Sequence, residues 1–166
     1  MAIYTLPYFG EFDTDNIEEY YDVSIPVNGH EVSVDLNFMT NKTDPDALRL
    51  VESFINNLSE YEKKSRKYIA DDYADENSEA VREYVDHHIE EFAPEELSAV
   101  IDYNNKTIKP ELQLITALKL VRVGLYPYDK EEFAIFDYSF NKDLTQYLVV
   151  VCTDHKGNLE RIAMES

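Results

Sequence analysis

Arg122, Asp137 and Tyr147 are predicted to lie side by side on one face of a C-terminal antiparallel sheet. A turn over 128–131 sets Arg122 opposite Asp137, and a turn over 141–143 sets Asp137 opposite Tyr147. Because their neighbours on that face are apolar, a lone charge would be costly there and a paired set is expected. Such a set is able to hold an anion or a peptide carbonyl, or it is a satisfied ion pair that fixes strand register. We favour the ion pair.

A second candidate for chemistry is His87, which helical periodicity places on one helix face with Glu83 and Glu91. Three ligands spaced four residues apart could converge on a metal ion. Exposed Glu–His–Glu faces are also common on acidic helices, and the His-Glu-x-x-His arrangement with its general base is missing. Gly-x-Ser-x-Gly and a glycine-rich phosphate loop are missing too. We therefore predict no catalytic residue, no metal and no cofactor.

The strongest functional signal is the distribution of charge along the chain. The formal net charge is -19 over 166 residues, and the first basic residue is Lys42. This field repels nucleic acid and anionic membranes, and it attracts a basic protein or cations. The carboxylates that precede the first basic residue are Glu11, Asp13, Asp15, Glu18, Glu19, Asp22, Glu31 and Asp35.

The elements that carry these acids include a predicted β-hairpin over residues 21–38. Apolar and polar residues alternate on both sides of Asn28-Gly29, the dipeptide typical of a two-residue hairpin turn. The register set by this turn places Asp22 opposite Asp35 on the face turned away from the core. Like charges directly across a sheet are destabilising. The pair therefore indicates a docking face for a partner's lysine or arginine, a weak cation site, or a solvated face screened by salt.

The rest of the chain contains helical patterns followed by strand patterns, which predicts an α+β fold in a single domain over residues 1–166. About four helices are expected within 43–102, the last over 94–101, all packed on one sheet face. Ahead of the hairpin, we expect a short strand over 3–9 and an acidic loop over 10–16. A C-terminal four-stranded antiparallel meander is predicted at 112–127, 132–140, 144–153 and 159–165.

Composition limits the class of protein. Hydrophobic residues make up 44% of the chain, which suits a packed core rather than a disordered acidic tail. The longest apolar stretches are far shorter than the roughly 20 residues that a membrane helix needs, and the N-terminus lacks the features of a signal peptide. Cys152 is the only cysteine, which excludes an internal disulfide and is typical of a reducing compartment. We expect a cytoplasmic protein without membrane contact.

Several stretches spread over nearly the full length carry a family resemblance. They are Tyr8-Phe-Gly-Glu-Phe-Asp13, Glu19-Tyr-Tyr-Asp-Val23, Asn28-Gly29, Asp35-Leu-Asn-Phe38, Leu118-Lys-Leu-Val-Arg-Val-Gly124, Phe136-Asp-Tyr138, Asp143-Leu-Thr-Gln-Tyr-Leu148 and Met164-Glu-Ser166. On these residues the chain resembles a bacterial family known as domain of unknown function 2004. The resemblance implies a single-domain bacterial cytoplasmic protein, and it carries no established activity or catalytic residues.

The leading hypothesis is a non-enzymatic binding protein that docks a basic protein, as toxin-neutralising immunity proteins do. Small acidic α+β proteins often antagonise basic toxins, which is an argument by association. One alternative is a small-molecule or metal-dependent enzyme built around Arg122, Asp137, Tyr147 or His87. Another is a self-associating module that buries a sheet face in a homodimer. The expected partner-binding residues are Glu11, Asp13, Asp15, Glu18, Glu19, Asp22, Asp35 and Tyr20, with Tyr8 and Phe12 as further aromatic anchors.

Overall fold

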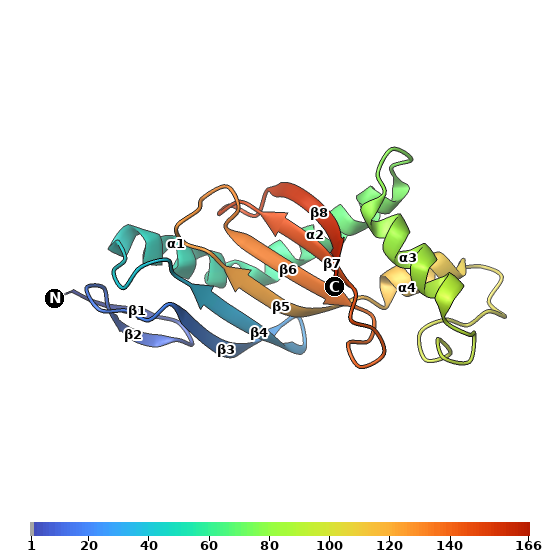
Figure 1. Cartoon of the computed structure of the whole chain (residues 1–166), viewed down its shortest axis with the longest axis horizontal. Coiled ribbons are helices and arrows are strands. Elements are labelled where there is room, and N and C mark those ends of the chain that lie inside the picture. Colours follow the sequence, from blue (N-terminus) through green and yellow to red (C-terminus); the bar gives the residue numbers. More distant parts are fainter. Residues whose placement is uncertain (1) are drawn as a thin grey trace.

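The computed structural model describes residues 2–166, which form eight β-strands and four α-helices (Figure 1). The strands are β1 Ile3–Leu6, β2 Gly10–Asp13, β3 Tyr20–Val27, β4 His30–Asn37, β5 Lys119–Leu125, β6 Ala134–Ser139, β7 Leu148–Thr153 and β8 Leu159–Glu165. The helices are α1 Pro45–Asn56, α2 Leu58–Ala74, α3 Ala80–Glu91 and α4 Pro110–Thr116. β1 and β2 form a two-stranded sheet, and β3 to β8 form a six-stranded sheet in sequence order. The α+β class is therefore as predicted.

Strands β3 and β4 form the predicted hairpin. Asn28 and Gly29 have φ of 48° and 90°, the left-handed conformation that this turn requires at both positions. The register sets Val23 opposite Val34 and Asp22 opposite Asp35, as the alternation of the sequence predicts.

The hairpin and the C-terminal strands belong to one sheet. Strands β5 to β8 pair as the predicted antiparallel meander. In addition, β4 pairs with β5 in parallel, with Val34 beside Val123. A parallel pair needs a long crossover connection, and residues 38–118, which contain all four helices, supply it. This mixed sheet was not predicted from the sequence.

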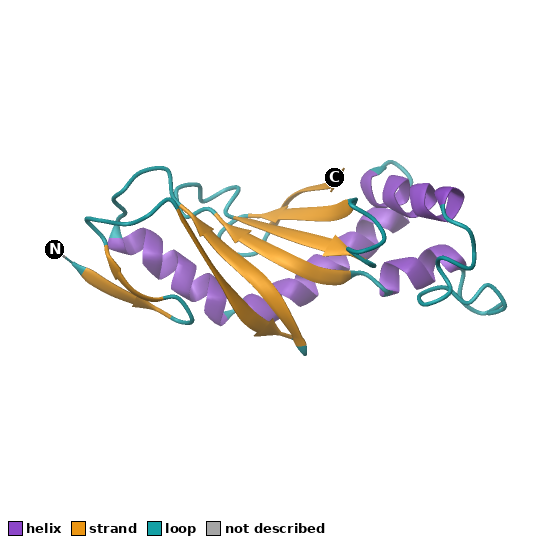
Figure 2. Ribbon diagram, turned by 60° about the horizontal axis from the view of Figure 1, so that its bottom comes forward, coloured by secondary structure: helices purple, strands orange, loops and turns teal. Residues whose placement is uncertain are grey.

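Helices α1 and α2 lie across one face of the six-stranded sheet, and α3 and α4 lie toward one end of it (Figures 1 and 2). The ring centroid of Phe136 in β6 is 6.0 Å from that of Phe54 in α1. The hydroxyl of Tyr138 donates to Oε2 of Glu62 in α2 at 3.0 Å. Because side chains alternate along a strand, Ile135 and Asp137 point to the opposite face. No helix of residues 2–166 lies over that face, which we call the open face.

Two predicted elements are wrong. The helix predicted over 94–101 is replaced by turns over 94–100. Hydrogen bonds between residues three apart, such as that from the Leu97 amide to the Pro94 carbonyl, close these turns. Residues 110–116 are helix α4 rather than the start of a strand. Proline suits the first turn of a helix wherever it occurs, so Pro94 and Pro110 carry the same start signal. Only the segment after Pro110 continues as a helix, where it buries Leu114.

The N-terminal segment is also more regular than predicted. Residues 10–13 form a strand instead of a loop, with Phe12 beside Tyr4 in the register of β1 and β2. The chain reverses at Tyr8 and Gly10, which have φ of 68° and 91°. One connected cluster of buried apolar side chains reaches from this hairpin to β7. Among residues 2–166, no helix is both long enough and apolar enough to cross a bilayer.

Candidate functional site

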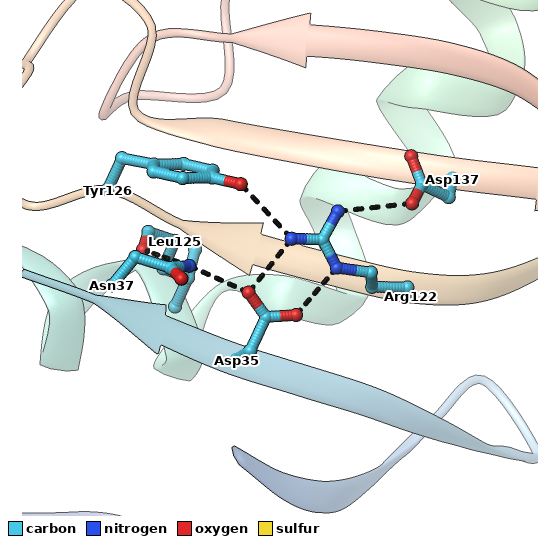
Figure 3. A network of polar contacts seen from close by, with 6 residues as sticks. All are labelled: Asp35, Asn37, Arg122, Leu125, Tyr126 and Asp137. Carbon is cyan, nitrogen blue, oxygen red and sulfur yellow. Dashed lines mark hydrogen bonds and ion pairs between the residues drawn. The ribbon is translucent and has the colours of Figure 1, made fainter. Parts of the chain in front are cut away.

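Arg122 is the centre of a polar network on the open face of the sheet (Figure 3). Its Nε donates to Oδ2 of Asp35 at 2.6 Å, and its Nη2 donates to Oδ1 of the same carboxylate at 2.9 Å. Nη1 donates to Oδ2 of Asp137 at 3.2 Å, and Nη2 also donates to the hydroxyl of Tyr126 at 3.1 Å. Asn37 completes the network by donating to Oδ1 of Asp35 at 2.7 Å. We call these five residues the Arg122 network.

The position of Asp35 corrects the sequence analysis. The side chain is only 2% exposed and forms a two-point ion pair with Arg122, so it is not available to a partner. The expected repulsion between Asp22 and Asp35 is therefore offset inside the molecule. The reason is the parallel pairing of β4 with β5, which brings together two residues that are 87 positions apart.

Arg122 and Asp137 lie together as predicted, directly opposite each other in β5 and β6. The hydrogen bond with Asp35 raises the pKa of the Arg122 guanidinium above its ordinary value, against the opposing effect of burial. Burial raises the pKa of the Asp137 carboxyl, while the hydrogen bond from Arg122 lowers it.

The occupied donors of Arg122 decide what this network is able to do. A guanidinium has five N–H groups, and those of Arg122 are directed to two carboxylates and a phenol, which leaves one on Nη1. The two carboxylates and one guanidinium sum to a net charge of -1. An incoming anion would therefore have to displace a carboxylate from Arg122. The arrangement fixes strand register more readily than it binds an anion.

Tyr147 does not belong to this network, which is a second correction. Val150, rather than Tyr147, lies opposite Asp137. β7 begins only at Leu148, because residues 142–144 form a turn and residues 145–147 have no regular structure. The Asn141 side chain accepts from the amide of Asp143 in this turn. The ring of Tyr147 instead contacts His87, with centroids 4.7 Å apart.

His88, the neighbour of His87 on α3, is fully buried. Its Nδ1 is 2.6 Å from the carbonyl oxygen of Tyr84, and its Nε2 is 2.7 Å from the hydroxyl of Thr145. Because a carbonyl only accepts, Nδ1 carries the proton and Thr145 donates to Nε2. Burial lowers the pKa of His88. Within residues 2–166, no group of three or more His, Cys, Asp or Glu side chains is placed to hold a metal ion.

Most of the predicted partner-binding residues lie on the surface. The exposed members are Glu11, Asp15, Glu18, Glu19, Tyr20 and Asp22, whereas Asp13 is half-buried and Phe12 is buried. Within residues 2–166, no basic side chain forms an ion pair with Glu11, Glu18, Glu19 or Asp22. We call these four residues the acidic end. Tyr20 lies beside it and is 53% exposed.

Residues important to the site were also missed by the sequence analysis. Tyr126 orients Arg122, and Asn37 ties Asp35 to the carbonyl of Leu125 at 3.2 Å. The sequence holds one usable signal, since Tyr126 and Tyr128 flank a proline at the end of a strand, where aromatic side chains tend to be half-exposed.

Comparison with known proteins leaves the family open. No family model, no curated protein and no solved structure matches the chain. The resemblance to domain of unknown function 2004 therefore stays a prediction.

Proposed function

We propose that this protein is a non-enzymatic binding protein that docks a basic protein partner through its acidic end. The observation that carries the proposal is the exposure of Glu11, Glu18, Glu19 and Asp22 without intramolecular ion pairs among residues 2–166. Exposed charges of one sign create a potential that steers a partner of opposite charge.

The ion pairs among residues 2–166 involve acids outside the acidic end. Lys63 and Lys67 pair with acids of their own helix, α2. Arg161 of β8 pairs with Glu132 at 3.2 Å. Arg122, the cation nearest in register to Asp22, is already bound to Asp35. The acidic end therefore offers charge that a cationic surface could neutralise.

A basic toxin is the partner class that this arrangement suits best, with the protein acting as its neutralising partner. Complementary charge raises the rate of association, and a fast rate is what a protective protein needs. In this proposal the protein is a bacterial cytoplasmic protein, as the family resemblance implies. Tyr20 and Tyr8, which are 53% and 59% exposed, supply aromatic contacts within the same surface.

A charge-reversal experiment with a defined probe tests the proposal. The probe is an oligolysine peptide, and its affinity for the whole protein is measured by calorimetry. The test variant carries Glu18→Lys, Glu19→Lys and Asp22→Lys. We expect a loss of affinity of at least about tenfold, because three close ion pairs are replaced by repulsion.

A matched control separates a docking surface from the effect of net charge. The control variant carries Glu83→Lys, Asp86→Lys and Glu90→Lys on the exposed face of α3, which changes the net charge by the same amount. It should bind the probe as the unmodified protein does. Equal losses in the two variants would overturn the proposal, because the probe would then respond only to the total charge.

A further inference from the structure

A cavity of about 210 Å³ opens at the edge of the open face, beside the Arg122 network. It lies where β5 ends and β6 begins, next to β8. Tyr126 belongs both to the network and to the wall of the cavity, so the two features are continuous. The lining residues are Tyr126, Tyr128, Asp129, Glu132, Ile135 and Arg161.

Two tyrosine rings form a corner in this wall. The ring centroids of Tyr126 and Tyr128 are 6.1 Å apart, and the ring planes meet at 83°. Tyr126 is held by the hydrogen bond from Nη2 of Arg122, while Tyr128 is 55% exposed. The faces of aromatic rings attract cations. Two aromatic rings that share a cavity wall with apolar Ile135 are therefore suited to a cation on an apolar stem.

The charges at the rim favour an ammonium over a guanidinium. Oδ1 of Asp129 already accepts from two backbone amides, and Oε1 of Glu132 already accepts from Nε of Arg161. Each carboxylate therefore has one oxygen that no donor within residues 2–166 reaches. A guanidinium binds best to both oxygens of one carboxylate, whereas an ammonium needs only single contacts.

The cavity lies close to the acidic end. Tyr20 is opposite Asn37 in the register of β3 and β4. The Asn37 side chain in turn donates to the carbonyl of Leu125, the residue before Tyr126. A partner seated on the acidic end would therefore extend over the open face toward the two tyrosines.

We propose that the corner formed by Tyr126 and Tyr128 receives a lysine side chain of the basic partner. This inference rests on the proposed function and specifies which residue of the partner is bound. The stem of the lysine lies against Ile135, and its ammonium contacts the ring faces and the unengaged oxygens of Asp129 and Glu132. Their two charges exceed the single charge of Arg161, so the lining carries a net charge of -1.

Nuclear magnetic resonance titration of the whole protein tests the ligand class. The probes are the N-acetyl methylamides of lysine, arginine and norleucine, which share an apolar stem and differ in the head group. The lysine probe should shift the signals of Tyr126 and Tyr128 and bind at least about threefold more tightly than the other two. Equal or tighter binding of the arginine probe, or shifts that avoid both tyrosines, would overturn the assignment.

Two variants test the roles of the individual groups. Tyr128→Leu keeps an apolar side chain but removes a ring face, and Asp129→Asn keeps the Oδ1 acceptor but removes the charge. Each should weaken the lysine probe at least about threefold. Tyr103→Leu is the control, because Tyr103 belongs neither to the cavity lining nor to the acidic end. An unchanged affinity in both pocket variants would overturn the proposal.

The oligolysine peptide separates failure of this inference from failure of the proposed function. Suppose that Tyr128→Leu leaves the affinity for the oligolysine peptide unchanged, while reversal of Glu18, Glu19 and Asp22 lowers that affinity. The peptide then binds the acidic end without entering the cavity. If the reversal itself has no specific effect, the proposed function fails as well.

Discussion

The guanidinium of Arg122 lies directly over Gly124, with no room for a side chain between them. A Cβ built on Gly124 would be 2.5 Å from Nη2 and 3.0 Å from Cζ of Arg122. The φ of Gly124 is not in the left-handed region, unlike that of Gly10, Gly29 and Gly157. Glycine is therefore required at this position for space rather than for backbone conformation.

Gly124→Ala should displace the Arg122 guanidinium and weaken its bonds to Asp35. We expect the free energy of unfolding to fall by about 1–3 kcal/mol, in the range seen when a methyl group is forced into a packed site. Denaturation in urea measures this change. Ser24→Ala is the control, because Ser24 lies in β3 on the same face of the sheet as Arg122 but is exposed. This substitution should change the free energy of unfolding little. Greater stability in Gly124→Ala would contradict the arrangement, because alanine is otherwise favoured over glycine in a strand.

Replacing Arg122 alone should lower the free energy of unfolding far more than replacing both members of its ion pair with Asp35. Arg122→Met leaves the buried Asp35 carboxylate unpaired, which should cost about 3–5 kcal/mol. Adding Asp35→Asn should recover part of that loss, since the amide carries no charge. A double-mutant cycle measured by urea denaturation gives the coupling energy. Additive effects of the two substitutions would show that the pair is not coupled.

His88 should make stability fall in mild acid. Its pKa is lowered from 6.5 by burial, so below pH 6.5 the unfolded chain takes up a proton that the folded protein resists. The unfolded state then binds more protons, and stability decreases as pH falls. His88→Gln keeps a donor and an acceptor but removes the titration. The free energy of unfolding should therefore drop less between about pH 7 and about pH 5.5 in this variant.

Ser24→Ala is the control for that measurement, because it is an exposed substitution that changes no titratable group. It should leave the pH dependence of the free energy of unfolding as it is in the unmodified protein. The same slope in His88→Gln and in the unmodified protein would show that His88 does not contribute.

Binding of the oligolysine peptide should weaken steeply as salt is added. The acidic end is exposed, and exposed charges are screened over roughly 8 Å at physiological ionic strength. Reversal of Glu18, Glu19 and Asp22 should also reduce the salt dependence itself, because fewer ion pairs are then formed. Affinity that does not change with salt would point to an apolar interface instead.

Local patterns predicted much of the fold and part of the site. The hairpin at Asn28-Gly29 and the pairing of Arg122 with Asp137 each depend on one short connection, so alternation and turn chemistry are enough to set the register. The antiparallel order of β5 to β8 follows in the same way.

Contacts between distant segments were not predictable in this way. Asp35 meets Arg122 across 87 residues, and nothing in the local sequence of either strand identifies the other as its neighbour. The error at Tyr147 has a different cause. Thr145 bonds to the buried His88, and residues 145–147 lie outside the strand, so β7 begins only at Leu148.

The parallel pairing of β4 with β5 also matters during biosynthesis. Asp35 leaves the ribosome 87 residues ahead of Arg122, so one edge of the nascent hairpin has no neighbouring strand for several seconds at roughly 5–20 residues per second. An unpaired edge invites association with other chains, and carboxylates on such an edge oppose it. The carboxylate of Asp35 therefore has no arginine partner at that edge until Arg122 has been translated.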